Sequence, residues 1–326
     1  MRFRSTSSLR AGVAAVLLAA GLSTAAFAYP TKPITIIVPF PAGAGPDVVA
    51  RLLAERLGPQ LKESIVVENR PGASGMVGAT AVARSPADGH TLLLTPNTLF
   101  IAPHLTAGDA KPPVDVIADF EPVIMPSQTT MVMVANPKLG VKTAREFADL
   151  AKKQTISYAS SGNGSVLHIA GELFASSAGV SMTHVPYRGI APAVTDVIAG
   201  HVQVTFAGLA PVTQHVNSGA LTALAVLDPK RSPSMANVPT AIEQGFSDVA
   251  VEGWYAVLAP KGTPRDVVQR LNKELNAILA SAEAKQKIEQ TGEVVLGGTP
   301  DDLAKRMKAD YDRYGEIVRR LKITAE

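Results

Sequence analysis

Short apolar runs alternate along the chain with stretches in which apolar residues recur at helical spacing. Residues 34–40, ITIIVPF, are β-branched and apolar, which is typical of a strand buried on both faces. After a loop of small residues, Val49, Leu52, Leu53 and Leu57 fall on one face of a helix. This order of strand, loop and helix predicts a βα unit, the building block of α/β proteins.

The same order continues to the end of the chain. Thr143 and Glu146 form a capping box that opens a helix, and the last helix begins with Thr299 as its cap. We therefore expect an α/β fold with mostly parallel sheets flanked by helices. Further strands are predicted at 64–70, 90–96, 130–137, 155–159, 182–187, 202–208, 221–227 and 254–260.

The pattern restarts near residue 130, which indicates two lobes. The last helices are predicted to return to the first lobe. We therefore expect lobe 1 to comprise 29–130 and 254–326, and lobe 2 to comprise 131–253, so that the chain crosses between lobes near residues 131 and 254. Ligands of such folds bind beyond the carboxyl ends of the strands, and a cleft between two lobes would gather several of these loops.

The first 28 residues have the composition of a secretory signal. A basic start with Arg2, Arg4 and Arg10 precedes an apolar core at 11–22, and Ala26-Phe27-Ala28 is an A-x-A cleavage site. The apolar run is short and interrupted by polar residues, which argues against a membrane anchor. We predict export, cleavage after Ala28 and a soluble periplasmic product.

Charge and cysteine content exclude several classes of function. The chain has 31 Lys and Arg against 28 Asp and Glu, but the signal carries three Arg and no acid, so the remainder is near neutral. A nucleic-acid partner would need a basic face, which the sequence does not indicate. The absence of cysteine excludes disulfides, zinc–thiolate sites and thiol nucleophiles. The six histidines lack paired metal-ligand spacing, so we expect neither a metal nor another cofactor.

Three strand-to-helix loops could hold a small anion, namely 39–47 (PFPAGAGPD), 95–98 (TPNT) and 160–165 (SSGNGS). Each places backbone N–H groups at or near a helix start, where the helix dipole favours negative charge. Such loops also form ordinary tight turns, so one alone is a weak indication. Phosphate-binding fingerprints and the nucleophile elbow are absent from the sequence. Two such loops, one from each lobe, indicate a site for a carboxylate or a small phosphate.

Single side chains near these loops have two interpretations each. His168, in the first turn after the SSGNGS loop, would either donate a hydrogen bond into the cleft or cap its helix near Glu172. Arg188 would either pair with a carboxylate or lie at the solvated rim. For Trp254, packing in the core at the hinge is favoured over stacking on a ligand.

Taken together, these motifs resemble the periplasmic solute receptors of tripartite tricarboxylate transporters, the Bug family. The resemblance implies a two-lobed Venus-flytrap fold that closes on a carboxylated solute. It also implies delivery of that solute to integral-membrane subunits and, by analogy, a monomer. It runs from Tyr29 to the C-terminus and rests on YPTKPITIIVPFPAGAGPD, VVENRPGASGMVGA, DGHTLLL, YASSGNGSVLHIAGELF, HVPYRGIAPAVTDVIAGHV, RSPSMANVPT and LAPKGTP, in that order.

In this family the ligand carboxylate is held by backbone and small polar groups of the first loop and the SGNGS loop. The resemblance implies ligand contacts from Phe40, Ala42, Gly43, Ala44, Asn97, Ser161, Asn163, Gly164, Ser165 and His168. We also expect Asp47, Tyr187, Arg188 and Ala207 to belong to the ligand-binding site.

The sequence departs from the family pattern in two segments. Pro46 replaces a hydroxyl residue before Asp47, and Asp47 itself is expected to support the loop and helix. Ala207 and Gly208 replace an acid and an amide. A bound ammonium group would then lack a counter-charge, which is costly once water is removed. We therefore expect an organic acid without an amine, whether a dicarboxylate, a tricarboxylate or an aromatic acid.

Two other functions would use the same cleft. An exported hydrolase or isomerase acting through Ser161 or His168 would need a base within hydrogen-bond reach of its substrate. A ligand sensor would present the loaded protein to a signalling partner. Because the sequence offers no catalytic constellation, we expect a binding protein rather than an enzyme.

Overall fold

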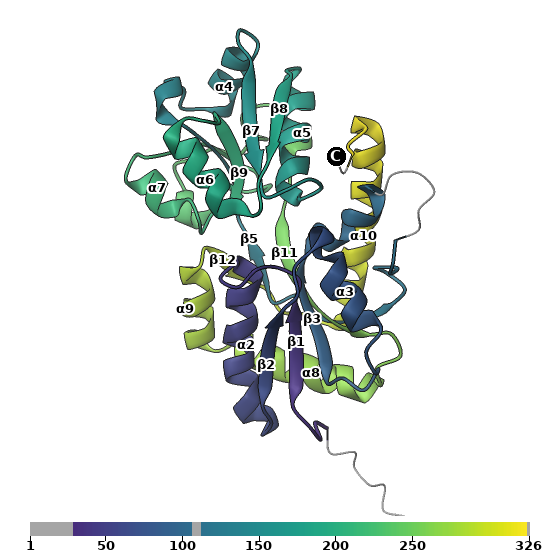
Figure 1. Ribbon diagram of the computed structural model, residues 1–326. Helices are drawn as coiled ribbons and strands as arrows, with labels where there is room; N and C mark the ends of the chain where they lie inside the picture. The colour runs from purple at the N-terminus through teal and green to yellow at the C-terminus, as the bar shows by residue number, and fades with distance from the viewer. Residues whose placement is uncertain (1–28, 106–111, 325–326) are drawn as a thin grey trace, which may run out of the picture.

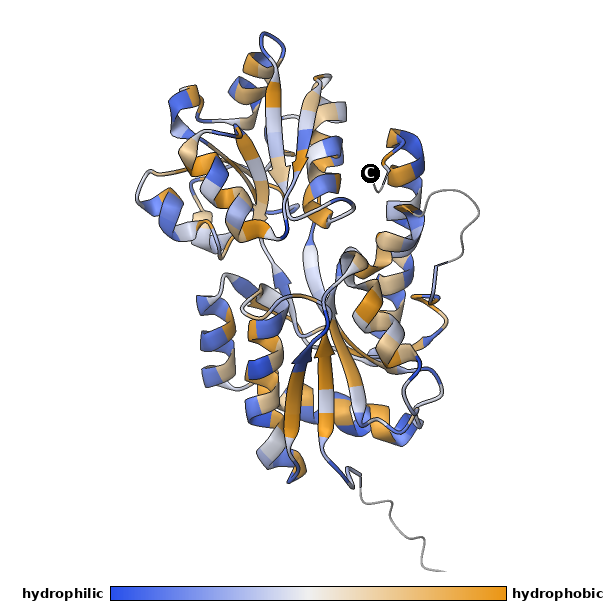
Figure 2. Ribbon diagram, viewed as in Figure 1, coloured by the Kyte–Doolittle hydropathy of each residue, from blue (hydrophilic) through white to orange (hydrophobic). Residues whose placement is uncertain are grey.

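The structure is a computed structural model, and it describes residues 29–105 and 112–324. The predicted signal at 1–28 and its cleavage site lie outside the described residues. Two β-sheets, each packed against helices, form two lobes, drawn one above the other in Figure 1. Apolar residues concentrate along the strands of the lower sheet and on the inward faces of its helices (Figure 2).

The lower lobe is built on a seven-stranded sheet in the order β12-β5-β11-β3-β1-β2, with β4 also paired to β11. Its strands are β1 (Ile34–Val38), β2 (Ile65–Asn69), β3 (Thr91–Pro96), β4 (Phe120–Ile124), β5 (Ser127–Thr129), β11 (Gly253–Pro260) and β12 (Glu293–Val295). Its helices are α2 (Gly45–Leu61), α3 (Met76–Ala83), α8 (Arg265–Leu279) and α9 (Ala282–Gln290), with short 3₁₀ turns η1 (Ala73–Gly75), η2 (Asn97–Phe100) and η3 (Ala102–Leu105).

The upper lobe is built on a five-stranded sheet in the order β10-β6-β9-β7-β8. Thr143 caps its first helix by accepting the Glu146 N–H, as predicted, but Glu146 Oε2 accepts the N–H of Lys142 rather than that of Thr143, so the capping box is only half formed. The strands are β6 (Met131–Ala135), β7 (Ile156–Ser160), β8 (Met182–Pro186), β9 (Val204–Gly208) and β10 (Thr222–Val226), and the helices are α4 (Ala144–Ala151), α5 (Val166–Ala178), α6 (Ile190–Ala199) and α7 (Thr213–Asn217).

The two-lobed α/β fold is confirmed, but both sheets are mixed rather than mostly parallel. β1 is parallel to β2 and β3, and β7 is parallel to β8 and β9. In contrast, β11 is antiparallel to β3, β4 and β5, and β6 is antiparallel to β9 and β10. β6 and β11 directly follow the two passages between the sheets. They therefore enter from the hinge and run against the strands of the βα units.

The hinge is anchored by Trp254, which lies at the start of β11. Its ring is fully buried and stacks on Phe100, with ring centroids 5.4 Å apart. Its Nε1–H donates to Asp310 Oδ2 at 2.7 Å. The ring therefore packs in the core of the lower lobe, which is the interpretation favoured from the sequence.

The last helix, α10 (Pro300–Leu321), packs against both lobes. Leu303 and Met307 lie in the same apolar cluster as Trp254, whereas Tyr314 and Ile317 lie in the core of the upper lobe. Figure 1 shows α10 rising from the lower lobe to the side of α5. The sequence assigned this whole helix to lobe 1, yet its packing is shared between the lobes.

Candidate ligand-binding site

The loop between β1 and α2 is held in shape by Asp47, which is buried. Asp47 Oδ2 accepts hydrogen bonds from Gly43 N (2.8 Å) and Arg51 Nε (3.0 Å), and its Oδ1 accepts one from Asn69 Nδ2 (2.9 Å). Burial alone would raise the pKa of Asp47, but the hydrogen bonds from Arg51, Gly43 and Asn69 hold it below its usual value. The carboxylate thus supports the loop, as expected from its place in the first turn.

Around this support the loop exposes its backbone. Ala42 and Gly43 are exposed and Ala44 is half-buried, while the ring of Phe40 packs on the core of the lower lobe. Gly43 has φ +80°, a conformation that favours glycine. Among the described residues, no protein group accepts the N–H of Ala42 or of Gly45. Since Gly45 begins α2, these donors lie where the helix dipole favours an anion.

The SGNGS loop (161–165), which directly follows Ser160 of β7, places the start of α5 in the upper lobe. Ser165 is buried and caps the helix, because its Oγ accepts the His168 N–H at 3.2 Å. Ser161 is half-buried, and no described group accepts its N–H or the first-turn N–H groups of Val166 and Leu167. This loop therefore also offers donors at a helix N-terminus.

His168 lies behind the loop. Its Nδ1 accepts the Gly164 N–H at 3.0 Å, and its Nε2 is 3.9 Å from Glu172 Oε1. The ring stacks on His184, with centroids 3.9 Å apart and planes 5° apart. Burial and the neighbouring His184 lower the pKa of His168 to about 3, so the ring is neutral. Of the two sequence interpretations, this geometry favours the one in which His168 serves its own helix and loop.

The two lobes touch at the SGNGS loop. Ser74, in the turn η1, donates its Oγ–H to the Asn163 carbonyl at 3.3 Å. A Cβ on Gly164 would overlap Leu105 Cδ1, which comes from η3 of the lower lobe. Ala73 and Ser74 have φ of +46° and +53°, which is strained backbone for residues with a side chain. The strained turn η1 therefore lies at the contact between the lobes.

The first loop is connected to this contact through η1. A Cβ on Gly75 would lie 3.6 Å from Phe40 Cε2, and Gly75 directly follows Ser74. Phe40, Ser74 and Asn163 therefore form a continuous path from the loop of one lobe to the loop of the other.

Two residues of the predicted site form side-chain hydrogen bonds with other parts of the protein. Asn97 is fully buried, and its Nδ2 donates to the Glu252 carbonyl (3.0 Å) and to Tyr314 Oη (3.3 Å), so it ties η2 to the hinge and to α10. Tyr187 Oη donates to Asp196 Oδ2 at 2.6 Å, and this bond fixes the ring against α6.

The last two predicted residues differ in their exposure. Arg188 is exposed, and no described residue forms a hydrogen bond or an ion pair with its guanidinium. Ala207 is fully buried in the apolar cluster that contains Val132 and Val194, so its side chain packs in the core of the upper lobe. The neighbouring Gly208 approaches the hinge instead, because a Cβ there would lie 2.9 Å from Thr129 Oγ1.

Sequence reasoning missed Ser74, Leu105 and His184. The pair of glycines at 72 and 75 in the segment PGASG was a usable signal for a special turn at Ser74. Leu105 and His184 carried no such signal, because an apolar residue and a lone histidine within a strand are ordinary components of a core.

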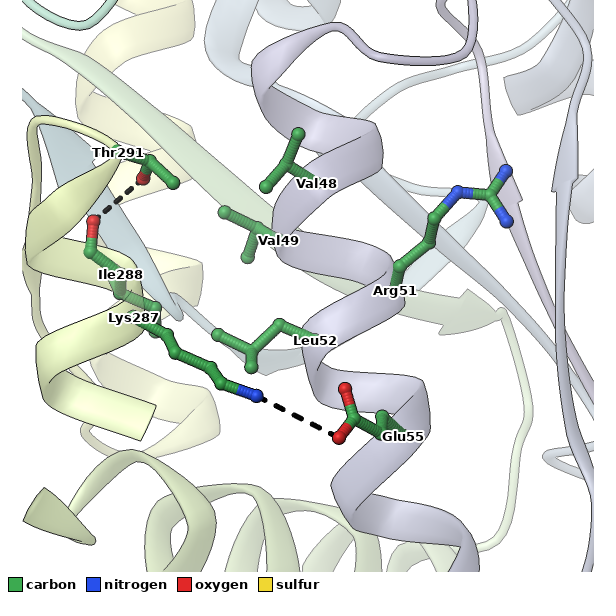
Figure 3. Close-up of a pocket in the computed structure, with 8 residues that line it drawn as sticks. All are labelled: Val48, Val49, Arg51, Leu52, Glu55, Lys287, Ile288 and Thr291. Atoms are coloured by element: carbon green, nitrogen blue, oxygen red, sulfur yellow. Dashed lines mark hydrogen bonds and ion pairs between the residues drawn. The ribbon is translucent and has the colours of Figure 1, made fainter. Parts of the chain in front are cut away.

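A separate groove lies on the flank of the lower lobe, between α2 and α9 (Figure 3). Its lining mixes apolar side chains with ions of both signs, including an ion pair of 3.8 Å between Lys287 Nζ and Glu55 Oε1. It contains none of the predicted site residues. The lining residues are Val48, Val49, Arg51, Leu52, Glu55, Lys287, Ile288 and Thr291.

Two searches of the described residues bear on other kinds of site. No cluster of His, Asp or Glu side chains in residues 29–105 and 112–324 is arranged to hold a metal ion. Over the same residues, no helix has the length and apolar character needed to cross a membrane.

The fold and the loops define the class of protein, that of the periplasmic binding proteins. The structure is similar to that of the periplasmic binding protein BugD, with a TM-score of 0.82 and 34% identity over 91% of this chain and 99% of that one. Residues 49–323 match the family described as the tripartite tricarboxylate transporter family receptor. The chain belongs to this family.

Two further relatives support the assignment. Protein BugT of Bordetella pertussis is 36% identical over 293 residues, which are 89% of this chain and 90% of BugT. The structure of Rpa4515 from R. palustris with adipate has a TM-score of 0.84 and 32% identity, and the match covers 91% of this chain and 99% of that one.

Proposed function

We propose that this protein binds a small organic carboxylate without an amine between its two lobes. In this proposal, the chain is cleaved after Ala28, works in the periplasm and delivers its ligand to the integral-membrane subunits of a tripartite tricarboxylate transporter. Lobe closure around the ligand would create the form that those subunits recognise.

One observation carries the proposal. Two helices from opposite lobes, α2 and α5, begin at glycine-containing loops that keep backbone N–H groups without a protein partner, and the Ser74–Asn163 hydrogen bond joins the two sides. Such N–H groups at a helix start stabilise an anion without a buried cation. Arg188, at the exposed end of β8, would add long-range attraction for a carboxylate.

The three loops themselves contain no free acid, which supports a ligand without an amine. Asp47 is the only carboxylate in the three loops, and it already accepts hydrogen bonds from Gly43, Arg51 and Asn69. A ligand ammonium would lose its water without gaining a counter-charge from these loops. The relative Rpa4515, whose structure holds adipate, is consistent with a diacid of this kind.

The structure does not favour the alternative of catalysis. Ser160 Oγ lies 2.6 Å from His184 Nε2, which is the distance of a serine–histidine pair. Ser160 is fully buried, however, and its Oγ is already within hydrogen-bond distance of the N–H and the carbonyl of Gly162. Nucleophilic attack would need an exposed oxygen beside the substrate.

The deciding experiment is a thermal-shift and calorimetry screen of residues 29–326 with matched ligands. Adipate, succinate, citrate, phthalate and benzoate would be compared with adipamide, which lacks the carboxylates, and with 2-aminoadipate, aspartate and glutamate. Ligand at a hundred times its dissociation constant stabilises a protein by about 2.7 kcal/mol, which raises Tm by several degrees.

We expect at least one amine-free acid to raise Tm, and neither adipamide nor the amino acids to do so. Tight binding of aspartate or glutamate alone would overturn the amine-free class. Silence across the whole panel would remove the support for carboxylate binding. If NMR of the mixture shows that a bound acid is converted into a product, the enzyme alternative is established.

A further inference from the structure

Two stacked histidine rings lie beneath the SGNGS loop, next to the N–H groups that the proposed function assigns to the ligand. The ring of His168, on α5, lies 3.9 Å from that of His184, on β8, with planes 5° apart. Tyr158, on β7, packs beside both rings, with its centroid 4.9 Å from that of His184 and 6.4 Å from that of His168. His168 is 6% exposed and His184 is partly buried, so the stack forms a layer between the loop and the core of the upper lobe.

Each histidine contacts a different end of the loop. His168 Nδ1 accepts the Gly164 N–H at 3.0 Å, near the start of α5. His184 Nε2 lies 2.6 Å from Ser160 Oγ, at the end of β7, and this oxygen accepts the Gly162 N–H at 3.1 Å. Both ends of the turn are therefore tied to one rigid pair of rings.

These contacts define the protonation state of His168. The Gly164 N–H can only donate, so Nδ1 must present a lone pair and the ring proton must sit on Nε2. Nε2 faces Glu172, whose Oε1 also accepts the hydroxyl of Tyr158 at 2.6 Å. A second proton on the ring would turn Nδ1 into a donor facing another donor, and it would place an imidazolium against His184.

We propose that His168 and His184 are positioning residues for the ligand: as a neutral stacked pair they hold Gly164 and Ser160, and thereby fix the N–H groups at the start of α5 that bind the carboxylate. This inference rests on the proposed function, in which those N–H groups contact the ligand. The pKa values, lowered by burial to about 3 for His168 and about 4 for His184, keep both rings neutral above pH 5.

The test compares three replacements of His168. Asparagine places its side-chain oxygen close to the position of Nδ1 and can accept from Gly164, whereas glutamine places its amide one carbon further out and alanine offers no acceptor. The affinity for the best acid of the screen, with adipate as the first probe, would be measured by calorimetry. Thermal unfolding without ligand would be measured in parallel, and His215→Asn on α7 serves as a control for a histidine outside the site.

We expect His168→Gln and His168→Ala to weaken binding roughly tenfold, the effect of losing one hydrogen bond to the loop. His168→Asn should stay within about threefold of the natural protein. Equal affinities for all three variants would overturn the proposal. If His168→Asn loses as much affinity as His168→Gln, the proposal is also overturned, because the loss then reflects a general effect of packing.

A second readout does not depend on the ligand. The Gly164 amide should be protected from hydrogen exchange in the natural protein and in His168→Asn, and it should exchange faster in His168→Gln. If no acid in the screen binds, the proposed function fails while this measurement still tests the positioning. If Gly164 is unprotected in the natural protein, the positioning role fails whatever the screen shows.

Discussion

Replacing Gly164 by alanine tests whether the lobes must meet at the SGNGS loop for the ligand to bind. Gly164 has φ +70°, and a Cβ there would overlap Leu105 Cδ1 of the lower lobe. Gly179 provides a matched control at the other end of the same helix. It has φ +65°, and no atom lies within 4 Å of the position of its Cβ. The two replacements thus share backbone strain and differ in the contact between lobes.

The expected magnitudes follow from this difference. A side chain in the left-handed region costs about 1–2 kcal/mol at either position, which lowers Tm by roughly 2–8 °C. At Gly164 alone, Leu105 must also leave its position when the lobes come together. An off-rotamer leucine costs about 0.5–1.5 kcal/mol, which corresponds to an affinity weaker by roughly two- to tenfold.

Calorimetry with the acid that gives the largest shift in the screen would measure this effect. Gly164→Ala should bind more weakly than Gly179→Ala, although both have lost similar stability. Adding Leu105→Ala to Gly164→Ala should return most of the affinity, because it removes the overlapping atoms. If Gly164→Ala and Gly179→Ala bind with the same affinity, or if Leu105→Ala gives no recovery, the lobes do not need this contact.

Three further outcomes are expected. Asp47→Asn should lower the urea midpoint by an amount equivalent to about 1–3 kcal/mol, since a neutral amide cannot replace the charged acceptor of Gly43 and Arg51; an unchanged midpoint would contradict this. The pKa of His168 is about 3 in the fold and near 6.5 when unfolded, so stability should fall as pH drops through that window, and His168→Asn should flatten the fall in pH-dependent unfolding. Burial raises the pKa of Asp228 to about 7, so the stability that its protonated form contributes should be lost as pH rises from about 4 to 7. Between pH 4 and pH 8, the free energy of unfolding of Asp228→Asn should therefore increase by on the order of 2–4 kcal/mol relative to that of the natural protein. Profiles of stability against pH that run parallel for the two proteins would refute this.

The regular parts of the fold followed from local pattern. Strands such as β1 and β3 are long apolar runs, and α4 carries its own start signal in Thr143, so both were predictable. The strands β4, β5 and β12 were not, because they are short and mix polar with apolar residues. Their strand conformation depends on partners that lie far away in sequence, because β4 and β5 pair with β11 and β12 pairs with β5.

The role of a site residue was predictable where its hydrogen-bond partners lie in the same loop, and not where they lie far away in sequence. Asp47 was assigned to loop support because its position in the first turn has a local reason. Asn97 is predicted from the sequence to bind the ligand, and the structure adds a second role, because its Nδ2 donates to Glu252 and Tyr314, which are 155 and 217 residues away. Nothing within its own segment distinguishes these two roles.

The packing of α10 limits how the lobes can separate. Its first half is buried against the lower lobe, and Tyr314, Ile317 and Val318 are buried in the core of the upper lobe. Exposing side chains of this size would cost about 1.5–3 kcal/mol each. An opening that keeps these side chains buried would therefore leave α10 in place. An opening of the lobes would break the Ser74–Asn163 hydrogen bond, and it would also have to move Leu105, which is buried with Ile101 in the core cluster of the upper lobe.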